Sequence, residues 1–180
     1  MNNEQNLVWI DLEMTGLDPE RHAIVEIATI ITDGQLNELA EGPTLVIHQP
    51  EEVLALMDEW VVTTHGKSGL IQKIHESTIS TQEAEQETLY FIQQYCAKNR
   101  GILAGNSVWQ DKFFLQRYMP RITNYLNYRI VDVTSVKEIL YRWYPKDSRL
   151  DFKKIDTHRA LSDIRESIEE LRHYRKNFFV

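Results

Sequence analysis

The chain has 180 residues, of which 42% are hydrophobic and 26% charged, and this composition predicts a single globular domain spanning 1–180 with no membrane-crossing segment. The single cysteine, Cys96, excludes an intrachain disulfide, and the N-terminus lacks a signal-peptide pattern, so we expect a cytoplasmic protein. The formal net charge of −7 argues against tight binding of long nucleic acid, because such binding depends on neutralising phosphates; a nucleic-acid substrate should be short or held through metal ions.

The first half of the chain has the pattern of three strands followed by two helices. Strands are expected at about 7–13, 23–32 and 36–48, and the short turns between them indicate an antiparallel meander. Apolar residues then recur at helical spacing in 68–77 and again in 81–95. Ser80 and Glu83 have the spacing of a capping box at the start of the second helix.

The second half alternates strands with helices. Strand-like segments at 102–105 and 128–133 precede helical segments at 110–118 and 135–144. The chain closes on a long helix with a row of apolar residues on one face: Leu161, Ile164, Ile168 and Leu171. Three strands followed by alternating helices and strands predict an α/β domain with a mixed sheet.

Two carboxylates lie in the first predicted strand, in the segment VWIDLEMTGLD. Side chains alternate across a strand, so Asp11 and Glu13 share one face while Ile10 and Leu12 point to the other. Without partners in a buried strand, the two negative charges would be costly. A solvent-exposed strand end would explain the pair without a function, whereas a divalent cation such as Mg²⁺ or Mn²⁺ would offset the repulsion.

Further polar residues occur where helices are expected to begin. Asp111 follows a strand and a Gly-Asn-Ser turn, where an acid also complements the helix dipole. His158 and Asp163 are five residues apart, which is about 140° of rotation within a helix. They therefore converge only if His158 lies before the first turn, with Thr157 as the candidate cap.

Together these residues resemble the DEDDh 3′→5′ exonucleases, a branch of the ribonuclease H-like superfamily, through the order Asp11-x-Glu13, Asp111, then His158 with Asp163 five later. More specifically, the chain resembles oligoribonucleases over almost its whole length, in segments such as IVEIAT, GNSVWQD, YRIVDV and THRALSDIRESIEELRHYR. The resemblance implies an α/β fold, a ribonuclease H-like mixed β-sheet flanked by α-helices. Trp109 departs from the family, which more often has a small residue there.

The resemblance implies a two-metal hydrolysis of short RNA, especially dinucleotides, from the 3′ end to nucleoside 5′-monophosphates. One ion would activate a water and the other would stabilise the leaving 3′ oxygen. His158 is the implied general base, because an unperturbed imidazole titrates near neutral pH. The implied ligands of two Mg²⁺ or Mn²⁺ ions are Asp11, Glu13, Asp111 and Asp163.

The same resemblance assigns substrate contacts. Leu17 would act as a wedge between the two terminal bases. Trp60 and His65 would pack against a base and contact the scissile phosphate, and Ser107 would touch the sugar–phosphate backbone. Core packing would also explain Trp60.

The segment YLNYRIVDVTS points to a homodimer through the resemblance. Tyr128 would reach into the site of the neighbouring subunit, while Arg129 and Thr134 would cap the 5′ phosphate. Such a cap explains a preference for very short substrates and agrees with the acidic charge of the chain. Asp132 is expected to have a structural role.

Two alternatives remain. A DEDDh DNA exonuclease or general RNA trimmer would carry the same acids, but it would need a more basic exit path and no paired Tyr128 and Arg129 on a dimer strand. A binding protein without catalytic activity would be expected to have a broken acid set, whereas all four acids and His158 are present in this sequence.

Overall fold

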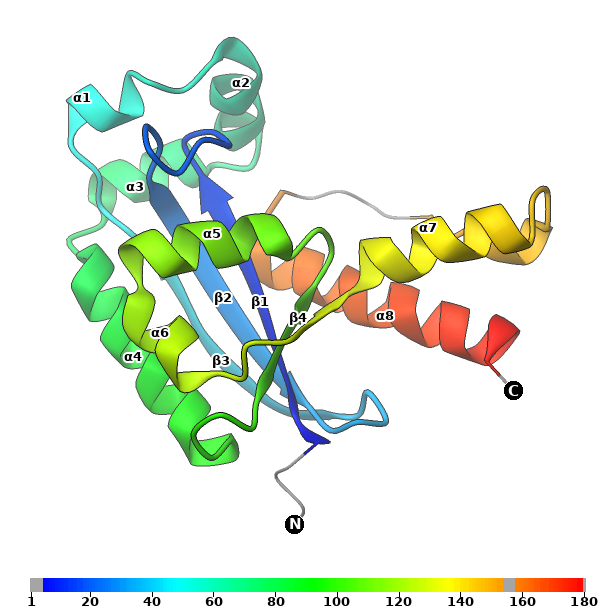
Figure 1. Ribbon diagram of the computed structural model, residues 1–180. Coiled ribbons are helices and arrows are strands. Elements are labelled where there is room, and N and C mark those ends of the chain that lie inside the picture. The colour runs from blue at the N-terminus through cyan, green and yellow to red at the C-terminus, as the bar shows by residue number, and fades with distance from the viewer. Residues whose placement is uncertain (1–4, 154–157, 180) are drawn as a thin grey trace.

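The computed structural model describes residues 5–153 and 158–179. Within these residues, five strands form one sheet in the order β3-β2-β1-β4-β5 (Figure 1). β1 pairs antiparallel with β2, which pairs antiparallel with β3, whereas β1–β4 and β4–β5 are parallel. This confirms the predicted meander and mixed sheet. The bounds are β1 Leu7–Met14, β2 Ile24–Thr32, β3 Glu38–Val46, β4 Ile102–Gly105 and β5 Ile130–Asp132.

Helices cover both faces of the sheet and the end at which β1 finishes (Figure 1). They are α1 Glu51–Leu54, α2 Glu59–Lys67, α3 Leu70–Glu76, α4 Thr81–Tyr95, α5 Trp109–Tyr118, α6 Pro120–Tyr125, α7 Val133–Trp143 and α8 Ala160–Phe178, with a short 3₁₀ turn at Ser148–Leu150. No helix in the described part of the chain is long and apolar enough to cross a membrane.

The alternation of β1 separates two hydrophobic cores. Val8, Ile10 and Leu12 pack on one face with residues of α4, α5 and α6. Trp9 packs on the other face with residues of α7 and α8, including Ile164. Asp11 and Glu13, which share the face of Trp9, are thereby directed toward α8.

Two local predictions are confirmed, namely the capping box of α4 and the structural role of Asp132. Ser80 and Glu83 form the capping box of α4, since Ser80 Oγ accepts from the Glu83 amide and the Glu83 carboxylate accepts from the Ser80 amide. Cys96 is buried in the core, and burial raises the pKa of its thiol to about 11. Asp132 caps α7 by accepting from the amides of Thr134 and Ser135, which is the expected structural role.

Other boundaries differ from those predicted. β5 is shorter than the expected 128–133, and α7 begins at Val133 rather than 135, because the Asp132 cap starts the helix directly after the strand. α1, α2 and α6 were not predicted. α2 contains the run Val61–Val62–Thr63–Thr64, whose β-branched side chains disfavour helix, but Asp58 caps it by accepting from the Val61 amide.

Candidate metal centre and active site

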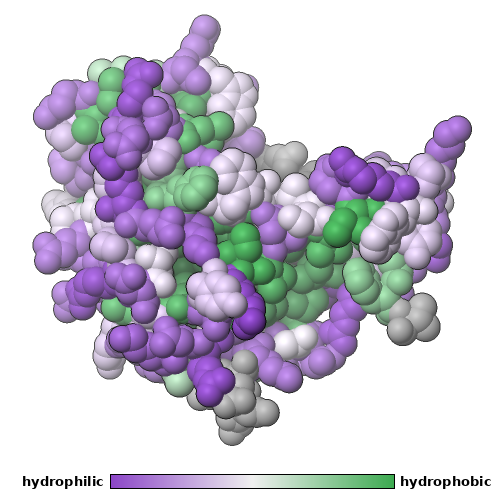
Figure 2. Space-filling model, in the orientation of Figure 1, coloured by the Kyte–Doolittle hydropathy of each residue, from purple (hydrophilic) through white to green (hydrophobic). Residues whose placement is uncertain are grey.

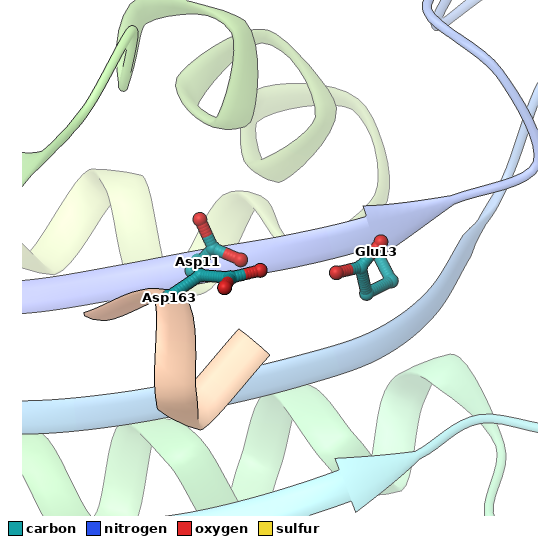
Figure 3. A group of neighbouring side chains, drawn as sticks. All are labelled: Asp11, Glu13 and Asp163. Atoms are coloured by element: carbon teal, nitrogen blue, oxygen red, sulfur yellow. The ribbon is translucent and has the colours of Figure 1, made fainter. Parts of the chain in front are cut away.

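Three of the four predicted metal ligands converge where β1 meets the start of α8. One carboxylate oxygen of each of Asp11, Glu13 and Asp163 lies within 4.8 Å of the others (Figure 3). Asp11 and Glu13 are two residues apart on the same face of β1, and Asp163 lies in the first turn of α8. Residues more than 140 positions apart in the sequence thus form one acidic cluster.

The cluster concentrates negative charge in a partly dehydrated place. Burial, together with the charges of Asp163, Glu26 and Asp111, raises the pKa of the Glu13 carboxyl to about 8, although Arg159 opposes the effect. Closely spaced carboxylate oxygens suit hard divalent cations. A cation bound by these oxygens would offset the repulsion, so the residues present fit a divalent metal.

Asp111 lies near this cluster but outside the group of three. It is buried in the first turn of α5, and its Oδ1 accepts from the backbone amide of Leu12 at 3.1 Å. Burial raises the pKa of Asp111 to about 7, although the hydrogen bond from Leu12 lowers it. The hydrogen bond from Leu12 therefore holds the Asp111 carboxylate against the β1 backbone beside Asp11, where its charge acts on the site.

His158 lies before the first turn of α8, as its convergence with Asp163 requires. The helix begins at Ala160, and Arg159 is its N-cap. The predicted cap, Thr157, lies outside the described residues. His158 has a φ of 51°, in the left-handed region that is uncommon for residues other than glycine. Such a conformation persists only where the surroundings hold it.

A pocket of about 420 Å³ adjoins the acidic cluster. Glu13, Leu17, Trp60 and His65 are among its lining residues. The side chains of Leu17 and Trp60 are 73% and 66% exposed, so neither is a core residue, and core packing does not explain Trp60. The pocket is therefore lined both by a carboxylate of the acidic cluster and by exposed apolar side chains.

His65 is held rigidly at the inner wall of this pocket. It is buried, and its Nε2 donates to the backbone carbonyl of Met14 at 2.9 Å. Its Nδ1 faces Glu13 Oε2 at 3.8 Å and has no hydrogen-bond partner in the described structure. Burial lowers the pKa of His65, which favours the neutral ring with a lone pair on Nδ1.

Ser107 and Thr134 meet at a second edge of the sheet. The Ser107 amide donates to Asp132 Oδ1 and to Thr134 Oγ1, and the two hydroxyl oxygens lie 3.1 Å apart. Ser107 has a φ of 48°, so this turn also holds a non-glycine residue in the left-handed region. The capped start of α7 therefore fixes the turn that follows β4.

Tyr128 and Arg129 lie together on an exposed segment before β5. Tyr128 is 73% exposed, and the Arg129 guanidinium lies over its ring, 5.0 Å from the centroid. Lys112 Nζ donates to the Tyr128 carbonyl oxygen at 2.6 Å, which fixes the backbone while leaving the phenol free to contact another molecule.

Comparison with known proteins places these features in a family. A model of the exonuclease family RNase_T matches residues 8–171. An oligoribonuclease of Pseudomonas paraeruginosa is 58% identical over 178 residues, which cover 99% of this chain and 98% of the relative. An oligoribonuclease of Dichelobacter nodosus is 54% identical over 180 residues, which cover 100% of this chain and 98% of the relative. The chain belongs to the oligoribonuclease family of exonucleases.

Solved structures of low sequence identity agree with the fold of oligoribonuclease expected from the sequence. Exonuclease I from Methylocaldum szegediense matches with a TM-score of 0.70 and 19% identity, covering 96% of this chain and 41% of the other. Exonuclease I of E. coli in a complex with single-stranded DNA matches with a TM-score of 0.73 and 13% identity, covering 97% and 40%. These matches confirm the expected fold, and the exonuclease family model and the curated relatives confirm the expected enzyme class, a hydrolase of the exonuclease type.

Two residues that touch the site of this oligoribonuclease family member were not predicted from its sequence. Glu26 is fully buried in β2, directly opposite Glu13 in the strand register. Arg159 pairs with it, with Nη2 donating to Glu26 Oε1 at 2.5 Å. The signal was present in IVEIAT, where a single carboxylate interrupts a strand of apolar residues, as in the Asp11-x-Glu13 segment.

Proposed function

We propose that the chain is a cytoplasmic 3′→5′ exoribonuclease of one domain, spanning 1–180, that hydrolyses short RNA oligonucleotides, especially dinucleotides, to nucleoside 5′-monophosphates. The observation that carries this proposal is the acidic cluster of Asp11, Glu13 and Asp163 beside a pocket with exposed apolar walls. High identity to curated oligoribonucleases over nearly the whole chain supports the choice of substrate.

The metal proposed for this site is Mg²⁺ or Mn²⁺, with two ions held by Asp11, Glu13, Asp111 and Asp163. The carboxylate chemistry of the cluster supports a hard divalent cation, and Asp111 is close enough to raise the pKa of Glu13. When bound, such ions supply positive charge that activates the attacking water and stabilises the departing 3′ oxygen.

The proposed general base is His158, which accepts the proton of the attacking water. Its place directly before α8, five residues from Asp163, supports this role. His65 contributes differently, because its buried ring is fixed by Met14 and offers Nδ1 beside Glu13. Because Nε2–H is used by Met14, Nδ1 would have to gain a proton before it could donate a hydrogen bond to the scissile phosphate.

The remaining assignments concern substrate length. The exposed Leu17 and Trp60 would hold the terminal bases, since apolar and aromatic surfaces stack on any base. Ser107 would contact the backbone, and Arg129 with Thr134 would bind the 5′ phosphate. With one end of the substrate at the acidic cluster and the other capped, only a very short oligonucleotide fits.

The proposed working unit is a homodimer in which Tyr128 of each subunit completes the site of its partner. The exposure of Tyr128 and the fixed backbone beneath it support this role. Exposed aromatic residues also occur on α7, among them Tyr141 and Trp143, and a second copy would cover part of this exposed surface. Figure 2 shows green, hydrophobic areas on the face of the molecule that carries α7.

The experiment that tests the function compares a labelled RNA dinucleotide with a longer labelled RNA under matched conditions. We expect the dinucleotide to be degraded faster than the longer RNA, with nucleoside 5′-monophosphates as products. Equal or faster degradation of the long RNA would instead favour a general RNA trimmer.

A further inference from the structure

We propose that Glu26 and Arg159 act as a positioning pair that fixes the start of α8, and with it His158 and Asp163, over the two carboxylates of β1. The inference rests on the site proposed above and adds two residues to it. Neither is proposed to contact substrate or to bind metal.

The contacts between the two residues form a complete fork. Arg159 Nε lies 3.2 Å from both oxygens of Glu26, and Nη2 donates to Oε1 at 2.5 Å. Glu26 Oε2 also accepts from the backbone amide of Ala160 at 3.1 Å. A buried carboxylate of β2 therefore holds both the side chain of the N-cap residue of α8 and the first amide of that helix.

The residues held by Glu26 are directly connected to Asp163 and His158. The Arg159 carbonyl accepts from the amide of Asp163 at 3.1 Å, so the cluster ligand is one hydrogen bond from the clamped residue. On the other side, His158 precedes Arg159 and has the left-handed φ of 51°. Holding Arg159 and Ala160 in place is a direct way to maintain that conformation, because both follow His158 immediately.

Burying a carboxylate at position 26 costs free energy, which suggests that Glu26 has a role in the site. It lies directly opposite Glu13 on the same face of the sheet, and like charges in that arrangement repel. Its neighbours on this face of β2, Ala28 and Ile30, pack in the core with α8. An apolar residue would dock the helix without adding charge beside the cluster, but it would offer no acceptor for Arg159 and the Ala160 amide.

Outer contacts of this kind orient metal ligands in proteins, and losing one commonly weakens metal binding or activity by about 10–100-fold. The guanidinium of Arg159 matches a carboxylate with two parallel donors, which the ammonium of lysine does not reproduce. The pair is therefore expected to be sensitive both to loss of charge and to loss of the fork.

A matched control exists on the same helix. Arg165 of α8 forms an ion pair with Glu41 of β3, so it also connects the helix to the sheet. The side chains of Arg165 and Glu41 are 48% and 44% exposed, whereas Glu26 is fully buried. Arg165→Gln thus removes a helix-to-sheet ion pair without touching the start of α8.

The test compares Arg159→Gln, Arg159→Lys, Glu26→Gln and Arg165→Gln in the full chain. Circular dichroism reports folding, calorimetric titration with Mn²⁺ reports metal affinity without substrate, and dinucleotide hydrolysis gives kcat and KM. Arg159→Gln should stay folded, bind Mn²⁺ about 10–100-fold more weakly and lose kcat by a similar factor, with KM changed much less. Arg159→Lys should recover part of both losses, and Arg165→Gln should behave as wild type.

Folded Arg159→Gln with wild-type Mn²⁺ affinity and kcat would overturn the inference, as would equal losses in Arg165→Gln. If Glu26→Gln does not fold, the partly exposed Arg159 still provides the decisive variants. Asp11→Ala distinguishes failure of the proposed metal site from failure of the positioning pair. If Asp11→Ala binds Mn²⁺ and turns over normally, the proposed site itself is wrong; if it is inactive while Arg159→Gln is normal, only the positioning pair is wrong.

Discussion

The indole ring of Trp60 meets the imidazole of His158 edge-on, with ring centroids 5.9 Å apart and an interplanar angle of 86°. Trp60 belongs to α2 and His158 precedes α8, so the contact joins the substrate pocket to the proposed base. An edge-on arrangement is a favourable geometry for two aromatic rings. The same indole can therefore stack on a nucleobase of the substrate and limit the rotation of the His158 ring.

Replacing Trp60 should affect activity more than stability, because two-thirds of its side chain is exposed. Trp60→Ala should raise KM for a dinucleotide and also lower kcat, since both the stacking surface and the contact with His158 are lost. A stacked base typically contributes about 1–3 kcal/mol, which corresponds to roughly 5–150-fold in binding. Trp60→Phe, which keeps a ring, should retain most of the activity. Unchanged steady-state constants for Trp60→Ala would contradict this role.

His158→Ala should lower kcat far more than it weakens substrate binding. General-base catalysis acts in the transition state and contributes about 10²–10⁴-fold. Steady-state kinetics on a dinucleotide, with saturating Mn²⁺, give the two constants separately. A change confined to KM would return His158 to a binding role.

The metal-free protein should become less stable as the pH rises from about 4.5 toward 8. Glu13 has a pKa of about 8 in the folded chain against an ordinary value of 4.5, so across this window the folded state binds more protons than the unfolded state. Its contribution to stability is complete below the lower value and is lost as the pH passes the upper one, at a scale of a few kcal/mol, since each pKa unit is about 1.4 kcal/mol.

Thermal unfolding of wild type and Glu13→Gln across this pH range checks the sign. Glu13→Gln should flatten the dependence, and Mn²⁺ should stabilise the wild type most at the upper end, where protons no longer compete for the carboxylate. Some dependence should persist in Glu13→Gln, because burial also raises the pKa of Asp111 to about 7. A wild type whose stability rises between these pH values would contradict the account.

Local patterns of the sequence predict much of this site. Strict alternation in β1 places Asp11 and Glu13 on one face, and the helical arithmetic of His158 and Asp163 requires the helix to start after His158, as it does at Ala160. These features depend only on backbone period, which neighbouring residues reveal.

Long-range contacts are what the sequence patterns do not reveal. Glu26 and Arg159 are separated by 133 positions, and no local period connects a strand interior to a helix cap so far away. The Asp111 carboxylate presents a related case, because its burial and its hydrogen bond from Leu12 depend on how α5 packs against β1. Tertiary packing, rather than local propensity, decides both.

Tyr128→Ala should abolish most of the hydrolytic activity, although Tyr128 is not one of the carboxylates of the acidic cluster. If each site borrows this residue from its partner, mixing inactive Asp11→Ala with inactive Tyr128→Ala and allowing subunit exchange should restore activity. A heterodimer then contains one complete site of two, so its activity should reach up to about half that of wild type. Confirmed exchange without recovered activity, or a fully active monomer, would rule out the shared site.

Hydrolysis of short RNA by the acidic cluster with divalent metal is tested by a time course of RNA dinucleotide cleavage by wild type and Asp163→Asn. The assay is run in chelator and then after adding back Mg²⁺ or Mn²⁺. We expect no cleavage in chelator, recovery of cleavage to nucleoside 5′-monophosphates in wild type, and no recovery in folded Asp163→Asn. Full cleavage in chelator, or normal cleavage by Asp163→Asn, would contradict this expectation.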